Sequence, residues 1–496
     1  MPQKENLYAL LGVSKDATPE EIRRAYHDAA RRLHPDVNVE PGATELFLVT
    51  KQVYEVLSDP AKRAAYDSSL PAETKVPPAF LRTQFSRSMI PRLDEKQIVY
   101  TILDLSANLE YATDSKEHPT PPLNLSLVLD HSTSMHGERM DTVKSAAIEL
   151  LRQLRPEDIL SIIVFSDRAQ VLLPAKRQPN REEIETQIRM IKAGGGTEIM
   201  RGLDAGFFEV RRNLSSDSIN HIILITDGQT YGDEEDCIEL AQRAAEYGIG
   251  ISGLGIGEEW NDSFLDNLAT RTGGSSAYIS KANDIKIFLQ DRFKELNRVF
   301  AKQVSLDFEP GPGIEMRYAF RLEPDPMPTL VDNPIRLGSI PRGSNLKVLL
   351  EFLISPVPAY MQDCFIGTGK LSLDIPSRAN GDSKLYLKLA RPVGGTANME
   401  IPSDDFLQAV SQVTLYRMQE QARKEVGEGN IIEASRRLQN LATHLLAQGK
   451  RDLAHTVLME AEHIHTTHGF SQSGEKRIKY GTRALLLPAK TEGDQP

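Results

Sequence analysis

Five oxygen-bearing side chains in three separate segments could together bind a hard divalent cation. Asp130 ends the apolar run LNLSLVLD and is followed by hydroxyls at alternate positions, Ser132 and Ser134. Thr197 lies in the segment GGGTEI, and Asp227 ends a second apolar run, HIILITD. Two carboxylates and three hydroxyls form an all-oxygen donor set, which suits octahedral Mg²⁺ or Mn²⁺ better than zinc. The alternative is a helix-capping loop, since Asp and Ser also favour helix N-termini.

A second candidate site is the tripeptide His34-Pro35-Asp36. Taken alone it is a turn, because proline restricts the backbone and Asp can accept a hydrogen bond from it. Its setting is more informative. An amphipathic helix is expected from Pro19 onward, and Pro35 stops it before a second helical pattern begins in PGATELF. The tripeptide is therefore predicted to connect two helices.

The segment that holds the five oxygen ligands alternates apolar strands with amphipathic helices. Short continuous apolar runs predict strands covered on both faces, namely LNLSLVLD, DILSIIVF, HIILITD and GIGISGLGI. Helical patterns between them predict right-handed crossovers and a doubly wound parallel α/β sheet over residues 121–301. Open α/β folds bind ligands at the carboxyl ends of their strands, so we expect the ligand loops to meet at that edge.

The other segments differ in composition and periodicity. Strand runs between Gly, Pro and Asp-rich turns predict an all-β segment in 302–395, and the β-branched run at 96–107 is expected to pair with it. The α/β domain would then be inserted into a β-sandwich. The predicted divisions are an all-α domain at 1–70, a linker at 71–95, the sandwich at 96–120 and 302–395, a helical region at 403–470 and a polar tail at 471–496.

Composition bounds the classes of function. The chain has 496 residues, which is too long for one core, and a net charge of −11 gives no electrostatic basis for binding nucleic acid. No apolar run approaches the roughly 20 residues that span a bilayer. The N-terminus has no secretory apolar core, and two cysteines, Cys237 and Cys364, suit a reducing compartment. We therefore expect a cytoplasmic protein with no nucleic-acid or membrane partner.

The first 70 residues resemble a J domain. The resemblance rests on YALLGV, the HPD tripeptide, YEVLSDP and KRAAYD. It implies an antiparallel pair of long helices whose HPD tip contacts a DnaK-type chaperone and stimulates its ATP hydrolysis. Arg23, Arg24 and Arg31 would contribute positive charge to that contact.

One position departs from the J-domain pattern. The family usually has a basic pair after the helix tyrosine, whereas here Tyr26 is followed by His27 and Asp28. Losing a cation at the rim of an interface mainly slows electrostatically steered association, so we expect a weaker or more selective pairing. The family's glycine/phenylalanine stretch and cysteine-rich zinc region do not follow residue 70, so general substrate holding is not expected.

Residues 121–301 resemble a von Willebrand factor A domain. D-x-S-x-S followed by Met and Gly, then GGT and TDG, match its metal-ion-dependent adhesion site at Asp130, Ser132, Ser134, Thr197 and Asp227. The resemblance implies one Mg²⁺ or Mn²⁺ whose open position takes water or the acidic residue of a protein partner. The strand at 96–107, the stretch IRLGSIPRGSNLKVLLEF and the ending KRIKYGTRALL are similar to bacterial proteins that flank such a domain with a β-sandwich and C-terminal helices.

These features predict a non-enzymatic co-chaperone adaptor that recruits a DnaK-type chaperone and binds an acidic protein partner through the metal. A metal-dependent hydrolase that uses the same ion is the alternative, although nothing in the sequence marks a general base for it. A third possibility keeps the A domain and treats the J domain as a structural dock without an ATPase role.

Overall fold

The computed structural model describes residues 7–13, 17–33, 43–69, 77, 79–108, 120–228, 232–279, 282–358, 360–376, 382–395 and 401–486. The chain forms two compact units, Met1–Pro77 and Pro78–Pro496. The HPD tripeptide at 34–36 lies outside the described residues.

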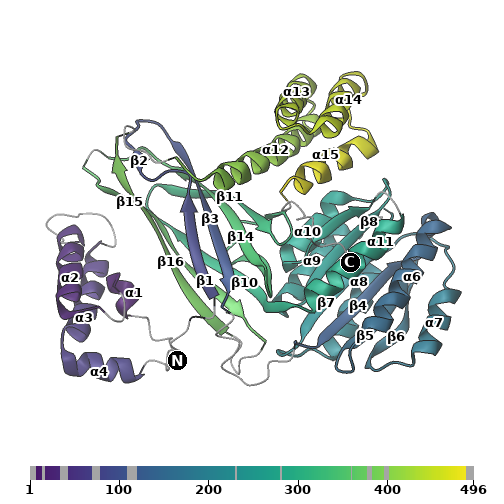
Figure 1. Ribbon diagram of the computed structural model, residues 1–496, viewed down its shortest axis with the longest axis horizontal. Coiled ribbons are helices and arrows are strands. Elements are labelled where there is room, and N and C mark those ends of the chain that lie inside the picture. Colours follow the sequence, from purple (N-terminus) through teal and green to yellow (C-terminus); the bar gives the residue numbers. More distant parts are fainter. Residues whose placement is uncertain are drawn as a thin grey trace. The chain divides into compact units, whose positions relative to one another are not determined.

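The N-terminal unit is helical, as predicted. Its helices are α1 (Leu7–Leu11), α2 (Pro19–Leu33), α3 (Ala43–Leu57) and α4 (Pro60–Ser69). A capping box starts α2, because the Thr18 N–H donates to the Glu21 carboxylate (2.8 Å) and the Glu21 N–H donates to the Thr18 hydroxyl (3.3 Å). Tyr26 of α2 stacks on Tyr54 of α3 with ring centroids 4.0 Å apart, so the two long helices lie side by side (Figure 1).

The α/β domain is built on a six-stranded sheet of order β6-β5-β4-β7-β8-β9. Its strands are β4 (Leu123–Asp130), β5 (Ile159–Phe165), β6 (Ala169–Arg177), β7 (Ile219–Thr226), β8 (Gly250–Ile256) and β9 (Ser276–Ile279). All neighbouring strands are parallel except β5 and β6. Only residues 166–168 separate those two, which is too few for a parallel crossover. The predicted doubly wound sheet is confirmed, with one antiparallel edge strand.

Helices cover both faces of this sheet (Figure 1). One face carries α6 (Glu138–Gln153), α7 (Arg181–Met190) and α11 (Ala282–Leu296), and the other α8 (Ile199–Arg212), α9 (Glu234–Glu246) and α10 (Asp262–Thr272). Every residue of β4, β5 and β7 is buried, which explains their continuous apolar runs. Gly202 lets α8 approach the sheet closely, because a Cβ there would lie 2.5 Å from the Phe165 ring.

The β-sandwich is formed by strands from both sides of the α/β domain, as predicted. One sheet has the order β1-β3-β14-β11-β12 and the other β13-β10-β15-β16-β2. Phe308 of β10 and Phe352 of β14 join the two sheets, with ring centroids 5.3 Å apart. The strands are β1 (Ala79–Phe85), β2 (Ile90–Pro91), β3 (Gln97–Ala107), β10 (Val299–Pro310), β11 (Ile314–Glu323), β12 (Met327–Thr329), β13 (Ile335–Pro341), β14 (Asn345–Ile354), β15 (Asp363–Asp374) and β16 (Asp382–Gly394).

Four helices end the described chain: α12 (Asp404–Gly427), α13 (Ile431–Ala447), α14 (Arg451–Thr467) and α15 (Gln472–Ala484). They share a core, and α12 also packs Phe406, Val413 and Tyr416 against Phe320 and Leu349 of the sandwich. No helix in the described parts of the chain is long and apolar enough to span a bilayer.

Two predicted boundaries are wrong. The linker expected at 71–95 contains β1, which pairs with β3 from Ala79↔Ala107 to Phe85↔Thr101. Its alternating pattern is weak because only Ala79 of β1 is buried. The polar tail expected at 471–496 begins with α15, which Ser471 caps by accepting from the Gly474 N–H (3.0 Å). Two of its charged residues, Lys479 and Arg483, form ion pairs with aspartates of the α/β domain.

Candidate metal site at the carboxyl edge of the sheet

The fold places two of the predicted ligands on adjacent strand ends. Strands β4 and β7 run parallel, with Leu129 opposite Ile225, so Asp130 and Thr226 end the strands together and Asp227 follows immediately. The chain leaves β4 toward β5 on one side and continues at β7 on the other. This is the point in a doubly wound sheet where the strand order reverses, and open α/β folds generally bind their ligands there.

The first loop connects Asp130 to Asp227 through the backbone N–H of Ser132 and the hydroxyls of Ser132 and Ser134. The Ser132 N–H donates to Asp130 Oδ1 at 2.8 Å. The hydroxyls of Ser132 and Ser134 lie 3.1 Å apart, and the Ser134 hydroxyl donates to Asp227 Oδ1 at 2.7 Å. Both carboxylates and Ser132 are buried, whereas Ser134 is exposed. The group therefore reaches the surface on the Ser134 side.

Asp130 is held by donors on either side of its carboxylate. Besides the Ser132 N–H on Oδ1, the Thr226 hydroxyl donates to Oδ2 at 2.6 Å. Burial raises the pKa of Asp130 and the charge of Asp227 adds to that effect, while the hydrogen bonds from Thr226 and Ser132 oppose it. A buried carboxylate with a raised pKa is stabilised in its charged form by a nearby cation.

The glycine-rich loop places Thr197 beside the same group. Its Gly194 N–H donates to the carbonyl of His131 (2.7 Å), and the Gly195 carbonyl accepts from the Thr133 N–H (3.1 Å). These bonds tie the loop to the first ligand segment. A Cβ at Gly228 would lie only 3.0 Å from Thr197 Oγ1, so the threonine side chain rests against the backbone directly after Asp227.

The donor set fits a hard divalent cation. The first and third predicted segments are hydrogen-bonded to each other, Thr197 of the second lies against Gly228, and two buried carboxylates supply the negative charge. Within the described ranges no group of three or more His, Cys, Asp or Glu side chains could hold a metal ion. Binding here would therefore depend on the hydroxyls of Ser132, Ser134 and Thr197 as much as on Asp130 and Asp227.

Arg139 is a neighbour of the site that the sequence analysis missed. It is the second residue of α6, and its Nη1 donates to Asp227 Oδ2 at 2.5 Å. The Asp227 side chain is 0 % exposed and that of Arg139 is 37 % exposed. A cation in the first turn of a helix is unfavourable, because the helix dipole already places positive charge there. The arginine in the segment GERM was therefore a sequence signal for a partner outside its own helix.

The predicted chaperone-binding residues are only partly described. Arg23, Arg24 and Arg31 are exposed on α2, as a docking face requires. The ring of Tyr26, in contrast, packs within the domain, where it stacks on the ring of Tyr54. The HPD residues themselves lie outside the described ranges, so their placement relative to these arginines stays a prediction.

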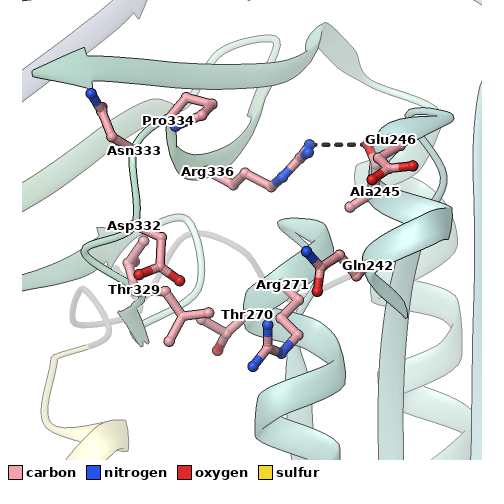
Figure 2. Close-up of a pocket in the computed structure, with 11 residues that line it drawn as sticks. Gln242, Ala245, Glu246, Thr270, Arg271, Thr329, Asp332, Asn333, Pro334 and Arg336 are labelled. Atoms are coloured by element: carbon pink, nitrogen blue, oxygen red, sulfur yellow. Dashed lines mark hydrogen bonds between the residues drawn. The ribbon is translucent and has the colours of Figure 1, made fainter. Parts of the chain in front are cut away.

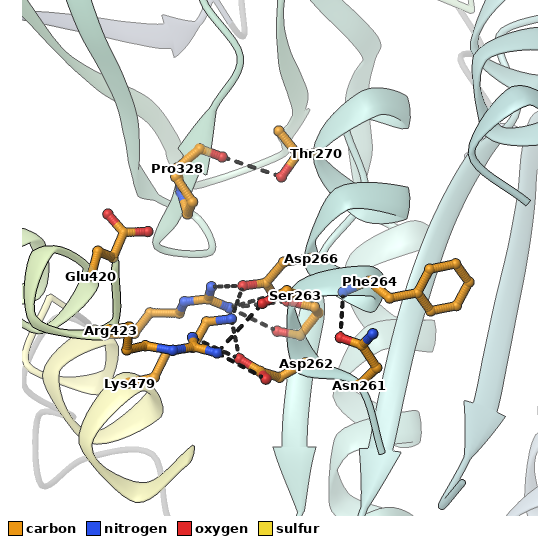
Figure 3. Close-up of polar contacts among 12 residues, drawn as sticks. Asn261, Asp262, Ser263, Phe264, Asp266, Thr270, Pro328, Glu420, Arg423 and Lys479 are labelled. Atoms are coloured by element: carbon orange, nitrogen blue, oxygen red, sulfur yellow. Dashed lines mark hydrogen bonds and ion pairs between the residues drawn. The ribbon is translucent and has the colours of Figure 1, made fainter. Parts of the chain in front are cut away.

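A second charged group joins the C-terminal helices to the α/β domain (Figure 3). Lys479 of α15 lies 2.5 Å from Asp262 and 2.6 Å from Asp266, both on α10. Arg483 and Arg423 complete the group, at 2.7 Å from Asp266 and 3.0 Å from Asp262. Burial alone would raise the pKa of Asp266, but the charges of Arg483 and Lys479 outweigh it and hold that pKa below its usual value.

A polar pocket lies between α9, α10 and the β12–β13 turn of the sandwich (Figure 2). Arg336 bridges it by donating to the Ala245 carbonyl at 3.0 Å, and Arg271, Glu246 and Asp332 also line it. None of the five predicted metal ligands is among its lining residues. The pocket is therefore separate from the candidate metal site.

Comparison with known proteins identifies three domains. Residues 6–67 match the DnaJ domain, residues 124–295 the von Willebrand factor type A domain, and residues 404–488 the Sll0103-like, C-terminal alpha-helical domain. Both predicted resemblances are thereby confirmed at the level of the domains. The last match includes α15, in agreement with the corrected C-terminal boundary.

Three relatives illustrate how far the similarity extends. The chain is 29% identical to the uncharacterized protein sll0103 of Synechocystis over 74% of this chain and 89% of that protein. It is 56% identical over 64 residues to the chaperone protein DnaJ of Geobacillus stearothermophilus, which covers 13% of this chain and 17% of DnaJ. A von Willebrand factor type A structure from Catenulispora acidiphila shares the fold, with a TM-score of 0.64 and 15% identity over 83% of this chain and 98% of that one.

Proposed function

We propose that this chain, which carries a DnaJ domain and a von Willebrand factor type A domain, is a non-enzymatic co-chaperone adaptor of the cytoplasm. Its J domain would recruit and stimulate a DnaK-type ATPase. Its A domain would bind a protein partner through a divalent metal ion and an acidic residue of that partner. The observation that carries the proposal is the hydrogen-bonded path from Asp130 through Ser132 and Ser134 to Asp227.

The metal ion would be Mg²⁺ or Mn²⁺ held by Asp130, Ser132, Ser134, Thr197 and Asp227. When bound, such an ion offers an electrophilic position to a carboxylate, because hydroxyl ligands neutralise little of its charge. The exposed Ser134 marks the side from which a partner can approach. Binding a partner in this way requires no general base.

Two binding modules on one chain explain how a weak contact between the J domain and the chaperone would be enough to bring the chaperone to the bound client. Exposed Arg23, Arg24 and Arg31 supply positive charge, whereas Asp28 replaces a cation usual in the family. Tethering the client to the A domain raises its effective concentration near the recruited chaperone, so affinity at each site can stay modest.

The proposal is tested by affinity capture with the full chain. Partners are captured in Mg²⁺ and in chelator, with wild type and with Asp130→Ala. We expect at least one protein that is lost in both chelator and the variant, and that is released by a peptide with a free carboxylate. Identical capture in all four conditions would contradict metal-dependent binding. Mg²⁺-dependent phosphatase or esterase activity lost in Asp130→Ala would favour the hydrolase alternative instead.

A further inference from the structure

We infer that Arg139 is the resident counter-ion of the candidate metal site and that its guanidinium competes with a divalent cation for Asp227. The inference rests on the proposed function, because it concerns the same ligand set. It adds a property that the ligands themselves do not predict, namely that the chain contains a built-in competitor that lowers the affinity for metal.

The hydrogen bonds of Asp227 carry the first step. Its Oδ1 accepts from the Ser134 hydroxyl at 2.7 Å and its Oδ2 from Arg139 at 2.5 Å. The carboxylate is fully buried, and a buried carboxylate is costly unless a cation or several donors compensate it. Arg139 provides that compensation from a side chain that remains partly in solvent.

The position of Arg139 on its helix carries the second step. The first turn of α6 contains Glu138 and Asp141, which suit the positive end of the helix dipole, whereas Arg139 opposes it. Local helix chemistry therefore does not explain an arginine at this position. Its ion pair with Asp227, which lies 88 residues further along the chain, does.

The loop that follows β8 provides a fixed position for the guanidinium, which is the third observation. Gly257 follows β8 with φ of +74°, and a Cβ at this position would lie 2.7 Å from Arg139 Nη2. The Gly257 carbonyl accepts from Trp260 Nε1 at 2.9 Å, which holds the loop in place. Lys476 of α15 also donates to the carbonyl of Glu258 in this loop. The C-terminal helices thus help to hold the loop against which the guanidinium lies.

The competition has a defined direction. A positive charge paired with Asp227 lowers the attraction of the site for any cation, and a divalent cation that binds Asp227 has to displace the guanidinium. Because Arg139 is 37 % exposed, it can turn into solvent without being buried elsewhere. Metal binding would then place the guanidinium at the rim, where it can contact the acidic partner.

The test uses the full chain and three arginine variants. Arg139→Gln removes the competing charge, and Arg139→Lys keeps it. Arg152→Gln is the matched control, because Arg152 lies in the last turn of the same helix, in an exposed pair with Glu185. Mn²⁺ binding is followed by the electron paramagnetic resonance signal of the free ion, and Mg²⁺ binding is followed by titration calorimetry. We expect Arg139→Gln to bind both ions about tenfold more tightly than wild type, and the other two variants to bind like wild type.

A measurement on the wild type does not depend on how the variants fold. Arginine modification by phenylglyoxal is followed by mass spectrometry with and without Mn²⁺, and we expect Arg139 to react faster with Mn²⁺ present. Arg152 serves as the internal reference. An unchanged rate at Arg139 would contradict the inferred competition, because a cation that takes Asp227 has to release the guanidinium.

The outcomes separate this inference from the proposed function. Metal binding by wild type that Arg139→Gln leaves unchanged or weakens would overturn the inference alone. Absence of binding in both wild type and Arg139→Gln would overturn the metal site and the inference together. Binding by Arg139→Gln that is tighter than that of wild type, and that is lost when Asp130→Ala is added, would support both.

Discussion

Lys479, which lies in the segment expected to be a polar tail, is buried between two aspartates of the α/β domain, 2.6 Å from Asp266 and 2.5 Å from Asp262. Its side chain is 4 % exposed. The C-terminal helices are therefore attached to the A domain through desolvated charges (Figure 3). They also make apolar contacts with the sandwich.

Removing one partner from this group should destabilise the protein strongly. Lys479→Met leaves Asp262 and Asp266 with fewer counter-charges in a buried setting, so we expect the free energy of unfolding to fall by about 3–5 kcal/mol. Chemical denaturation measures it. The control is Lys424→Met, which breaks an exposed pair with Glu428 and should change little. Equal effects of the two substitutions would contradict the predicted role of the buried group.

Stability should fall on mild acidification because of His221. Burial, with a further contribution from the charge of Arg292, lowers the pKa of His221 to about 3, and its Nε2 lies 2.9 Å from the Ser252 hydroxyl. The unfolded chain takes up a proton at this histidine near pH 6.5, whereas the folded protein does not until about pH 3. Above pH 6.5 the histidine is neutral in both states and does not disfavour folding. As the pH falls below 6.5, protonation of the unfolded chain lowers the free energy of unfolding.

Going from pH 7 to pH 5 should cost about 2 kcal/mol through this residue alone. Urea unfolding of wild type and His221→Gln at both pH values isolates that amount, because the variant lacks the titrating group. A pH dependence that is the same in both proteins would show that His221 is not held neutral in the folded state.

Asp130 should contribute to metal binding and not to stability without metal. Asp130→Asn removes a buried negative charge, and burial raises the pKa of the Asp130 carboxyl because it disfavours that charge. The Thr226 hydroxyl can rotate to accept a hydrogen bond from the new amide. In chelator we expect the variant to unfold at the same or a higher temperature than wild type. At Mg²⁺ near 100 times its dissociation constant, wild type should gain about 2.7 kcal/mol and the variant nothing. A gain retained by the variant would contradict the assigned ligand.

His34 should be needed for the chaperone response alone. We expect His34→Gln to abolish stimulation of ATP hydrolysis by a DnaK-type chaperone, while thermal unfolding and Mg²⁺-dependent capture remain as in wild type. A steady-state ATPase assay with the full chain measures the stimulation. Stimulation that survives the substitution would instead support a J domain that acts as a structural dock.

Local patterns were sufficient for much of the architecture. Continuous apolar runs such as β4 and β7 are buried on both faces, and a strand of that kind has a signature within its own eight residues. The capping box of Thr18 and Glu21 is equally local. The strand β1 was missed because its stability comes from pairing with β3 and only one of its seven residues is buried.

The sequence by itself determined the succession of helical, α/β and all-β segments and predicted the five candidate oxygen ligands, because strand runs, caps and motif spacing are properties of neighbouring residues. Only the tertiary structure decided that Arg139 pairs with Asp227 and that Lys479 and Arg483 are buried against α10. A charged side chain has the same sequence signature in solvent as in a buried ion pair. Its state depends on which distant carboxylate the folded chain brings within hydrogen-bonding distance.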